Sequence, residues 1–431
     1  MSKLKIHENR RNFILNGQKF FYLADTVWSA FTNAAMEEWE FYLEKRWSQG
    51  YTVLQINTLP QWDRCLFEES IYPFHTEDGQ TFDFDRWNED YYIRARRMCK
   101  MAVDRGFQLA LVVLWLNYVP GTWGSRIMAG NVMPEDFVRK YAGKVVDEFE
   151  EFDPIYLISG DTDFDDEEAV AYYETALDTV CKKSPESLKA MHVKRGYDYI
   201  PEQFLDRIGF YMYQSGHNAD GQDMAYVLAE HFYKKYPSKP VINGEPCYEQ
   251  MGYSRRRYGR FQPYDIRKAA WSGILSGACA GVAYGAHGVW NWKKMGKRTN
   301  PVLGEGFDES FPVQEALDFP GAWDYGFIGD FLETWGITEL KPVQELLEEN
   351  LPEIRMAQTE DESYLIYVPY TTNLVITKYL DGYHGKAIDL DTGRTAKVKL
   401  EGEAGKTLIH MHGFQRDALI LLRKQNAVNN K

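Results

Sequence analysis

Two segments of this 431-residue sequence end in a glycine followed by an acidic residue. Residues 155–161 read IYLISGD and residues 239–245 read KPVINGE, so Asp161 and Glu245 each follow an apolar run. An unpaired carboxylate at the end of a buried strand is costly, so both positions need a chemical reason. A protonated and an ionised carboxyl group can cleave a glycosidic bond, with retention at a separation of about 5–5.5 Å and inversion at a wider one. We take Asp161 and Glu245 as the candidate catalytic pair.

Both acids also have structural interpretations. Asp161 can begin the helix that follows, because acidic side chains favour the positive end of a helix, and Glu245 can belong to a structural ion pair. The spacing of Asp161, Asp163 and Asp165 resembles a calcium loop, but the sixth position is Asp166 rather than glycine. The sequence therefore predicts no metal and no other cofactor. The glycine before each acid is expected to let the backbone approach the substrate closely.

Short apolar runs alternate with helical patterns along the first 350 residues, as in a parallel sheet with crossover helices. Strands are expected at 20–23, 53–57, 109–114, 155–159, 190–193, 208–211, 240–243 and 281–284. Helices are expected at 36–49, 89–105, 134–150, 166–183, 222–236, 264–276 and 323–335, with a weak one at 201–206. Eight such units predict an α/β fold of the (β/α)8 TIM-barrel type. An open doubly wound sheet is the alternative, but 24–28 lacks its glycine fingerprint.

The active site of such a barrel lies at the carboxyl ends of its strands. Carboxylates, amides and flat aromatic rings all occur there, and this combination suits a sugar. The candidate substrate-binding residues are Asp25, Trp28, Gln55, Asn57, Trp115, Tyr211, Gln214, His217, His287, Trp290 and Trp292. Trp62 and Trp123 fall in the same group of loops. Tyr211 can donate to Glu245 or simply pack, and His287 can equally make a local hydrogen bond.

A basic run, Arg255–Arg257 with Arg260, lies in the loop after the seventh strand. Charge runs of this kind are usually solvated loops. The closeness of this run to Glu245 leaves open an anionic substrate group, such as a uronate, held by arginine forks.

Both ends of the chain show strand and turn patterns in place of the alternating strands and helices of the middle. An Asn16-Gly17 pair between apolar runs predicts a type I′ hairpin. After residue 350, short alternating runs at 364–368, 374–377, 385–390, 395–400, 407–412 and 418–423 are separated by turn signals. We therefore expect a barrel domain at 1–350, with the hairpin at its start, and a small β-sandwich domain at 351–431.

Composition limits the partners of this protein. A net charge of −14 disfavours nucleic acid and anionic membranes, and the five cysteines lack the spacing of a zinc site or a disulfide framework. Apolar runs long enough for a membrane span and an apolar signal-peptide core are both missing from the sequence, so a cytoplasmic location is expected, although a trimmed leader would look the same. The expected partner is a carbohydrate, and the composition does not specify an oligomeric state.

These residues together resemble the apiosidase-like branch of barrel glycoside hydrolases, whose members carry a C-terminal sandwich labelled as collagen-binding. The resemblance rests on FYLADTVWSAF, GYTVLQINTLPQW, ISGDTDF, NGEPCYE and AYGAHGVWNW. It implies Asp161 as general acid/base and Glu245 as nucleophile in a retaining, metal-independent reaction. Retaining barrels of the broader group usually have Asn-Glu at the fourth strand, where this sequence has Gly160-Asp161. An aspartate is one methylene shorter, so either the backbone comes closer to the substrate or the two carboxyl groups lie farther apart.

The sequence therefore predicts a glycoside hydrolase that cleaves a glycosidic bond in a small oligosaccharide or a polysaccharide side chain. A carbohydrate-binding barrel that has lost catalysis is one alternative. A lyase acting on an acidic sugar is another, and its product would contain an unsaturated ring. The sequence specifies neither the sugar, nor the linkage, nor endo against exo action.

Overall fold

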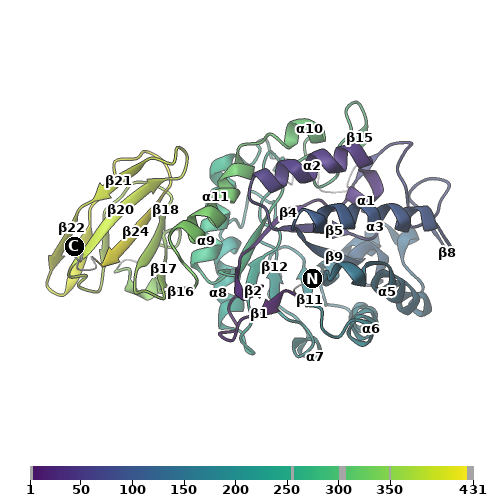
Figure 1. Cartoon of the computed structure of the whole chain (residues 1–431), viewed down its shortest axis with the longest axis horizontal. Helices are drawn as coiled ribbons and strands as arrows, with labels where there is room; N and C mark the ends of the chain where they lie inside the picture. Colours follow the sequence, from purple (N-terminus) through teal and green to yellow (C-terminus); the bar gives the residue numbers. More distant parts are fainter. Residues whose placement is uncertain (1–2, 254–256, 300–306, 349–350, 425–431) are drawn as a thin grey trace.

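The computed structural model describes residues 3–253, 257–299, 307–348 and 351–424. Eight parallel strands close into a barrel in the order β4, β5, β9, β10, β11, β12, β13, β14 and back to β4 (Figure 1). Their bounds are β4 Tyr22–Thr26, β5 Val53–Asn57, β9 Gln108–Trp115, β10 Ile155–Thr162, β11 Lys189–Val193, β12 Tyr211–Tyr213, β13 Val241–Asn243 and β14 Gly281–Tyr284. The predicted (β/α)8 barrel is confirmed, and each expected strand overlaps an observed one.

Helices surround the barrel, and the ends of each expected helix lie within two residues of the observed ones. The expected helices are α2 Met36–Ser48, α3 Glu89–Asp104, α5 Glu135–Phe149, α6 Glu167–Lys183, α7 Glu202–Leu205, α8 Met224–Lys234, α9 Pro263–Leu275 and α11 Gly321–Thr334. Short elements in the loops are α1 Ala30–Asn33, α4 Trp123–Ile127, α10 Val313–Ala316, β6 Cys65–Leu66 paired with β15 Arg298–Thr299, and β7 Phe74–His75 paired with β8 Asp83–Trp87. Single 3₁₀ turns occur at η1 Leu116–Tyr118, η2 Ala129–Asn131, η3 Glu150–Phe152 and η4 Gln344–Leu346.

The barrel strands are almost wholly buried, because their side chains pack either inside the barrel or against the helices. Strands of this kind read as nearly continuous apolar runs, which is why the sequence reveals them. The start of α6 is capped by Asp166, whose side chain accepts from the Glu168 N–H at 2.8 Å. Asp161 is therefore not the cap of this helix.

A small antiparallel sheet, β1 Lys5–Ile6, β2 Phe13–Leu15 and β3 Gln18–Phe20, precedes the barrel. Asn16 and Gly17 connect β2 to β3 with φ of +56° and +78°, as a type I′ turn requires. The ring of Phe13 packs edge-on against Phe210, at a centroid distance of 5.4 Å, just before β12. The predicted hairpin is confirmed, and it packs at the amino-terminal ends of the strands, away from the expected site.

The C-terminal part is a sandwich of two antiparallel sheets, as predicted. One sheet has the order β16, β17, β18, β24, β20, β21 and the other β19, β23, β22. The bounds are β16 Leu340–Pro342, β17 Arg355–Thr359, β18 Tyr364–Val368, β19 Leu374–Ile376, β20 Tyr383–Asp389, β21 Thr395–Val398, β22 Leu400–Glu403, β23 Lys406–Ile409 and β24 Ala418–Lys424. Because β16 pairs with β17, the larger sheet begins before residue 350, and we propose a domain boundary near residue 339.

The sandwich packs against the α9 and α11 side of the barrel (Figure 1). Arg267 of α9 holds the two parts together. Its Nη2 and Nε donate to the two carboxylate oxygens of Asp417 at 2.8 and 3.1 Å, and its Nη1 donates to Asp324 of α11 at 2.9 Å. Asp417 is fully buried and Arg267 is only 3% exposed, so this is a buried ion pair across the contact between the domains.

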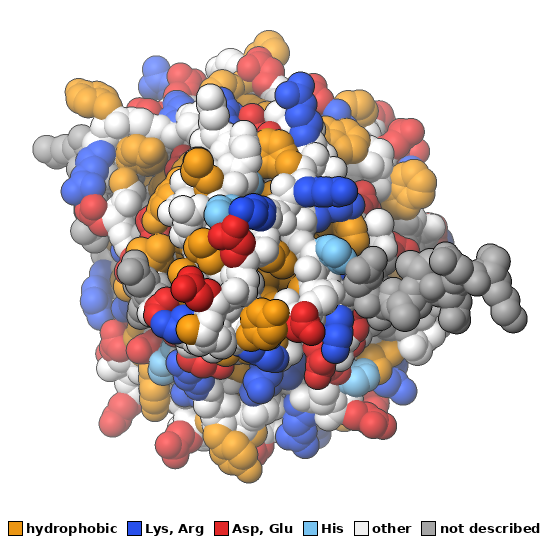
Figure 2. Space-filling model, turned by 90° about the vertical axis from the view of Figure 1, so that its left-hand side faces the viewer, with side chains coloured by type: hydrophobic (Ala, Val, Ile, Leu, Met, Phe, Trp, Pro, Cys, Tyr) orange, Lys and Arg blue, Asp and Glu red, His pale blue; other side chains and the backbone are white. Residues whose placement is uncertain are grey.

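Acidic and basic side chains are interspersed with smaller hydrophobic areas over the outer face of the C-terminal domain (Figure 2). Among the described helices, none combines the length and the apolar character that a membrane crossing needs.

Candidate active site

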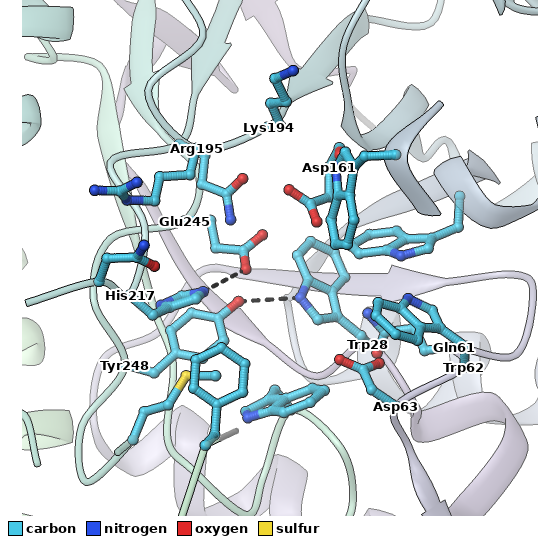
Figure 3. A pocket seen from close by; sticks show the side chains of 17 residues that line it. Trp28, Gln61, Trp62, Asp63, Asp161, Lys194, Arg195, His217, Glu245 and Tyr248 are labelled. Carbon is cyan, nitrogen blue, oxygen red and sulfur yellow. Dashed lines mark hydrogen bonds and ion pairs between the residues drawn. The ribbon is translucent and has the colours of Figure 1, made fainter. Parts of the chain in front are cut away.

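A pocket of about 270 Å³ lies at the carboxyl ends of the barrel strands, and Asp161 and Glu245 both line it. Figure 3 shows their carboxyl groups pointing into this pocket from two sides. Asp161 comes from the end of β10 and Glu245 from the segment that follows β13. The fold therefore brings together two acids that lie far apart in the sequence.

Asp161 projects from a β-bulge. Between Ser159 and Thr162, β10 contains one residue more than the facing stretch of β11. Asp161 has a φ of +53°, a left-handed conformation that is uncommon outside glycine and better tolerated by aspartate than by most residues. Bulges often re-aim a side chain beside an active site. Here the bulge and the left-handed backbone accompany the inward direction of the Asp161 side chain.

The glycine before Asp161 has a different role from the one expected. A Cβ atom on Gly160 would lie 2.1 Å from the indole ring of Trp115. Glycine is required because this ring packs directly on the backbone of β10. A Cβ on Gly244 would meet the Met212 side chain at 2.5 Å. Both glycines therefore admit a neighbouring side chain, which corrects the expectation that they admit the substrate.

Glu245 is 6% exposed and lies between two histidines. Nε2 of His217 is 2.8 Å from Oε1, and Nε2 of His192 is 3.2 Å from Oε2, although the latter pair is poorly aligned for a hydrogen bond. Burial alone would raise the pKa of Glu245, but the contacts with the two histidines outweigh burial and lower this pKa to about 2. Glu245 is therefore ionised at neutral pH.

His192, on β11, links the two acids. Its Nδ1 accepts a hydrogen bond from the backbone N–H of Asp161 at 2.9 Å. When Nδ1 accepts, the ring proton of a neutral histidine is on Nε2, the atom that faces Glu245. His192 is fully buried, and its ring packs against Trp28 and Trp115. The histidine therefore fixes the main chain at Asp161 relative to the carboxylate of Glu245.

Indole rings form much of the pocket wall. Five of the six tryptophans expected in strand-end loops line it, namely Trp28, Trp62, Trp115, Trp123 and Trp290. The Nε1 atoms of Trp115 and Trp290 and the Oε1 atom of Gln214 are buried and have no hydrogen-bond partner among the described residues. Buried polar atoms nearly always have a partner, so their arrangement around one pocket indicates a ligand with several polar groups.

Asp25, expected to bind substrate, lies outside this pocket. It is fully buried, accepts from Arg46 Nε at 2.6 Å and from the Tyr42 hydroxyl at 2.8 Å, and so faces α2. Successive side chains of a strand point to opposite sides, and Thr26, the next residue, contacts Gln55 inside the barrel. The prediction for Asp25 is corrected on this ground.

Gln55 and Asn57 are also absent from the pocket lining. Gln55 is fully buried and donates to the backbone carbonyl of Gly244 at 3.0 Å, so it supports the segment that carries Glu245. Asn57 accepts from the Leu59 N–H at 3.0 Å and organises its own loop.

Three aromatic predictions are corrected as well. The Tyr211 hydroxyl donates to the Pro237 carbonyl at 2.8 Å, because Tyr211 begins β12 rather than ending it. Nδ1 of His287 lies 3.2 Å from the Gln250 carbonyl, and burial lowers the pKa of this histidine to about 3. Trp292 is fully buried and donates to Glu38 at 3.0 Å.

The basic run after the seventh strand contributes no described residue to the pocket lining. Arg257 pairs with Asp220 at 2.6 Å, and Arg260 donates to the Gln250 and Glu309 carbonyls. Arg255 and Arg256 lie outside the described residues.

The structure adds residues that the sequence did not indicate. Asp63, Lys194, Arg195 and Tyr248 line the pocket, and His192 lies directly behind it. The Tyr248 hydroxyl accepts from Trp28 Nε1 at 3.1 Å, and burial together with the charge of Glu245 raises the pKa of Tyr248 well above its usual value. Asp63 directly follows the loop residue Trp62, which was the one available signal. His192 occupies an apolar strand, where a histidine is usually a core residue.

Comparisons with known proteins agree with this fold. A solved glycoside hydrolase has 20% identity and a TM-score of 0.77, over 98% of this chain and 97% of that one. A glycoside hydrolase family 5 protein from Bacteroides vulgatus ATCC 8482 also has 20% identity, with a TM-score of 0.80 over 98% of this chain and 93% of that one. Identities this low show likeness of fold alone. No curated protein matches the sequence.

The family profile described as "Apiosidase-like, catalytic domain" matches residues 7–339, which include the whole barrel and every pocket residue described above. That match covers more than half of the chain. The chain therefore belongs to the apiosidase-like catalytic domain family and is a glycoside hydrolase.

Proposed function

We propose that this protein is a retaining glycoside hydrolase that acts on a short oligosaccharide or on a polysaccharide side chain, with Glu245 as nucleophile and Asp161 as general acid/base. The observation that carries the proposal is the presence of both carboxyl groups in one tryptophan-lined pocket. A volume of about 270 Å³ is at the low end for ligand pockets, which typically measure about 300–1,000 Å³. This size favours one or two sugar residues at the end of a chain.

The environment of Glu245 supports the nucleophilic role. A nucleophile must be ionised when the substrate binds, and the two histidines lower the pKa of Glu245 to about 2. Nε2 of His217 lies 2.8 Å from Oε1 of the carboxylate, and the buried ring of His192 packs beside Oε2 at 3.2 Å. The carboxylate is thereby held in one orientation, from which one of its oxygens can form a bond to the anomeric carbon.

The position of Asp161 supports the acid/base role. In the first step its carboxyl proton passes to the leaving oxygen as the bond between that oxygen and the anomeric carbon breaks. In the second step its carboxylate takes a proton from water, which displaces Glu245 from the anomeric carbon. The bulge at Gly160–Asp161 changes the backbone path where an aspartate stands in place of the longer glutamate. We expect the two carboxyl groups to be about 5–5.5 Å apart.

A panel of 4-nitrophenyl glycosides tests this proposal. Replacing the nucleophile in Glu245→Gln should lower kcat by about 10⁴-fold or more on the hydrolysed glycoside. Asp161→Asn should lower it by about 10²–10⁴-fold on substrates with poor leaving groups, and less on aryl glycosides, which need little protonation. Asp165→Asn, which changes an exposed aspartate four residues away, is the matched control and should retain full activity.

Product stereochemistry separates the mechanisms. Proton NMR of the first-formed product should show the anomeric configuration of the substrate. Azide added to Asp161→Ala should give a glycosyl azide of retained configuration, and azide added to Glu245→Ala should give the inverted one. An inverted sugar product from the wild type would contradict retention. Full activity of both carboxylate variants would contradict the assignment of the pair, and an unsaturated product would indicate a lyase.

A further inference from the structure

A third carboxyl group, that of Asp63, faces the same pocket as Asp161 and Glu245. It follows β5 in the loop that also contributes Trp62 to the pocket wall. Figure 3 shows its carboxyl group pointing into the pocket near Trp28, on the side away from Lys194 and Arg195. Neither of the two steps proposed above uses this carboxyl group.

No described side chain pairs with Asp63, whose carboxyl group accepts a hydrogen bond from its own backbone N–H. Its Oδ1 atom is buried and has no hydrogen-bond partner among the described residues. The adjacent cation, Arg64, donates to the carbonyls of Gln61 and Gly79 instead. Burial, and to a smaller extent the charge of Glu245, raise the pKa of Asp63 to about 7. A carboxyl oxygen that is buried without a donor is costly, so the Oδ1 atom of this half-buried aspartate calls for a donor that arrives with the ligand.

The neighbours of Asp63 indicate what the donor is. Three unpartnered polar atoms of the pocket wall are uncharged, namely the indole Nε1 atoms of Trp115 and Trp290 and the amide oxygen of Gln214, while Nδ1 of His217 and Oε2 of Glu245 also lack a hydrogen-bond partner among the described residues. Donors and acceptors of this kind match the hydroxyl groups of a neutral sugar. A carboxyl group has two oxygens side by side, so it can bind two neighbouring hydroxyls at once. A carboxylic acid can bind hydroxyls in either protonation state, whereas an ammonium group requires the ionised form.

From this arrangement we propose that Asp63 is a specificity-determining residue that binds two adjacent hydroxyl groups of the sugar held in the pocket. The enzyme then selects glycosides that carry a free vicinal diol at this place. The inference rests on the proposed function in that the ligand is a glycoside, but it does not depend on the roles of Asp161 and Glu245.

Monodeoxy analogues of the best 4-nitrophenyl glycoside in the panel test the inference. Removing either contacted hydroxyl should lower kcat/KM of the wild type by about 10–100-fold, the effect of one hydrogen bond to a charged group. In Asp63→Ala, kcat/KM should fall by a similar factor on the parent glycoside and should not fall further on the deoxy analogues. Asp63→Asn keeps the shape of the side chain and so guards against a folding defect. Its kcat/KM should lie between the values of the wild type and of Asp63→Ala. Asp85→Ala, which alters an exposed aspartate on β8, should behave like the wild type.

Two outcomes would overturn the inference. In one, Asp63→Ala discriminates between parent and deoxy glycosides as strongly as the wild type does. In the other, the wild type prefers the 4-nitrophenyl glycoside of an amino sugar and loses that preference in Asp63→Asn, which would assign an ammonium ligand to this carboxyl group.

A binding assay separates this inference from the proposed function. Five tryptophans line the pocket, so methyl glycosides of the same sugars should change the tryptophan fluorescence of Glu245→Gln. Fluorescence changes that depend on Asp63 without any hydrolysis by the wild type would refute the proposed function and support this inference. Hydrolysis by the wild type, with a discrimination between parent and deoxy glycosides that does not depend on Asp63, would support the proposed function and refute this inference. If the panel gives neither hydrolysis nor a fluorescence change, both proposals fail.

Discussion

At the scale of single residues, the histidines beside Glu245 set the pH range in which this carboxylate is charged. His217 contributes a hydrogen bond to the ionised form, so its removal raises the pKa of Glu245 towards or above the usual value of 4.5. The reaction needs the ionised form. In His217→Ala the acidic limb of the kcat/KM profile should therefore move to higher pH, and this limb reports on the free enzyme.

His231→Ala is the control for this measurement, because His231 is exposed on α8. His217 also lines the pocket, so a general loss of activity in His217→Ala would not be informative, whereas a displaced limb would be. An unmoved acidic limb in this variant would contradict the electrostatic role assigned to His217.

The candidate pair could be predicted at this scale because a Gly-acid sequence at the end of an apolar run is unusual. Other residues could not be predicted, for two physical reasons. Asp25 lies one position from Thr26, and a strand sends these neighbours to opposite sides, so an error of one residue exchanges the inside of the barrel for the helix layer. His192 is a single polar residue in an apolar strand, and its role depends on Asp161 and Glu245, which reach it only in the folded barrel.

At the scale of elements, the contact between β10 and Trp115 limits what can occupy position 160. A methyl group on Gly160 would overlap the indole ring, so either the ring or the bulged strand must move. Overpacking of this kind typically costs about 1–3 kcal/mol. Gly160→Ala should lower the free energy of unfolding by that amount, measured by urea denaturation, and should lower kcat/KM by more than about tenfold, because Trp115 and Asp161 lie on either side of it.

Gly130→Ala provides the comparison. This glycine has open space around the added methyl group and is not in a left-handed conformation. It should change neither stability nor activity. If Gly160→Ala and Gly130→Ala changed the free energy of unfolding and kcat/KM equally, the contact with Trp115 would not be what limits position 160.

Whole elements were easier to predict than single residues. The barrel strands are covered on both faces, so they appear in the sequence as nearly continuous apolar runs. The amphipathic helices have clear boundaries, such as Pro263 at the start of α9. β16 and β17 were missed, because β16 has only three residues and ends in a proline, and Arg355 opens β17 with a charge. That arginine is buried against Ser276, a partner on the barrel that no local pattern reveals.

At the scale of the molecule, we expect the buried ion pair between Arg267 and Asp417 to couple the unfolding of the two domains. Removing one partner of a buried pair leaves an uncompensated charge and typically costs about 3–5 kcal/mol. Arg267→Ala should lower the free energy of unfolding by about this much, and calorimetry should show the sandwich melting apart from the barrel. Arg207→Ala, which removes half-exposed ion pairs with Glu174 and Asp178, should lower the free energy of unfolding by at most about 1 kcal/mol. A single transition at the wild-type temperature in Arg267→Ala would contradict the coupling of the domains.

The closure of the barrel by β14 pairing with β4 has a consequence for the synthesis of this protein. The first and last barrel strands meet only after the ribosome has released almost the whole barrel sequence, and contacts between such distant segments form slowly. Trp28 follows β4 and Trp290 follows β14, so the pocket wall is complete only once these chain ends have joined. Nascent chains arrested before residue 281 will therefore have no sugar affinity, whatever structure they have already gained. Ligand binding by arrested chains of increasing length would time the closure of the barrel.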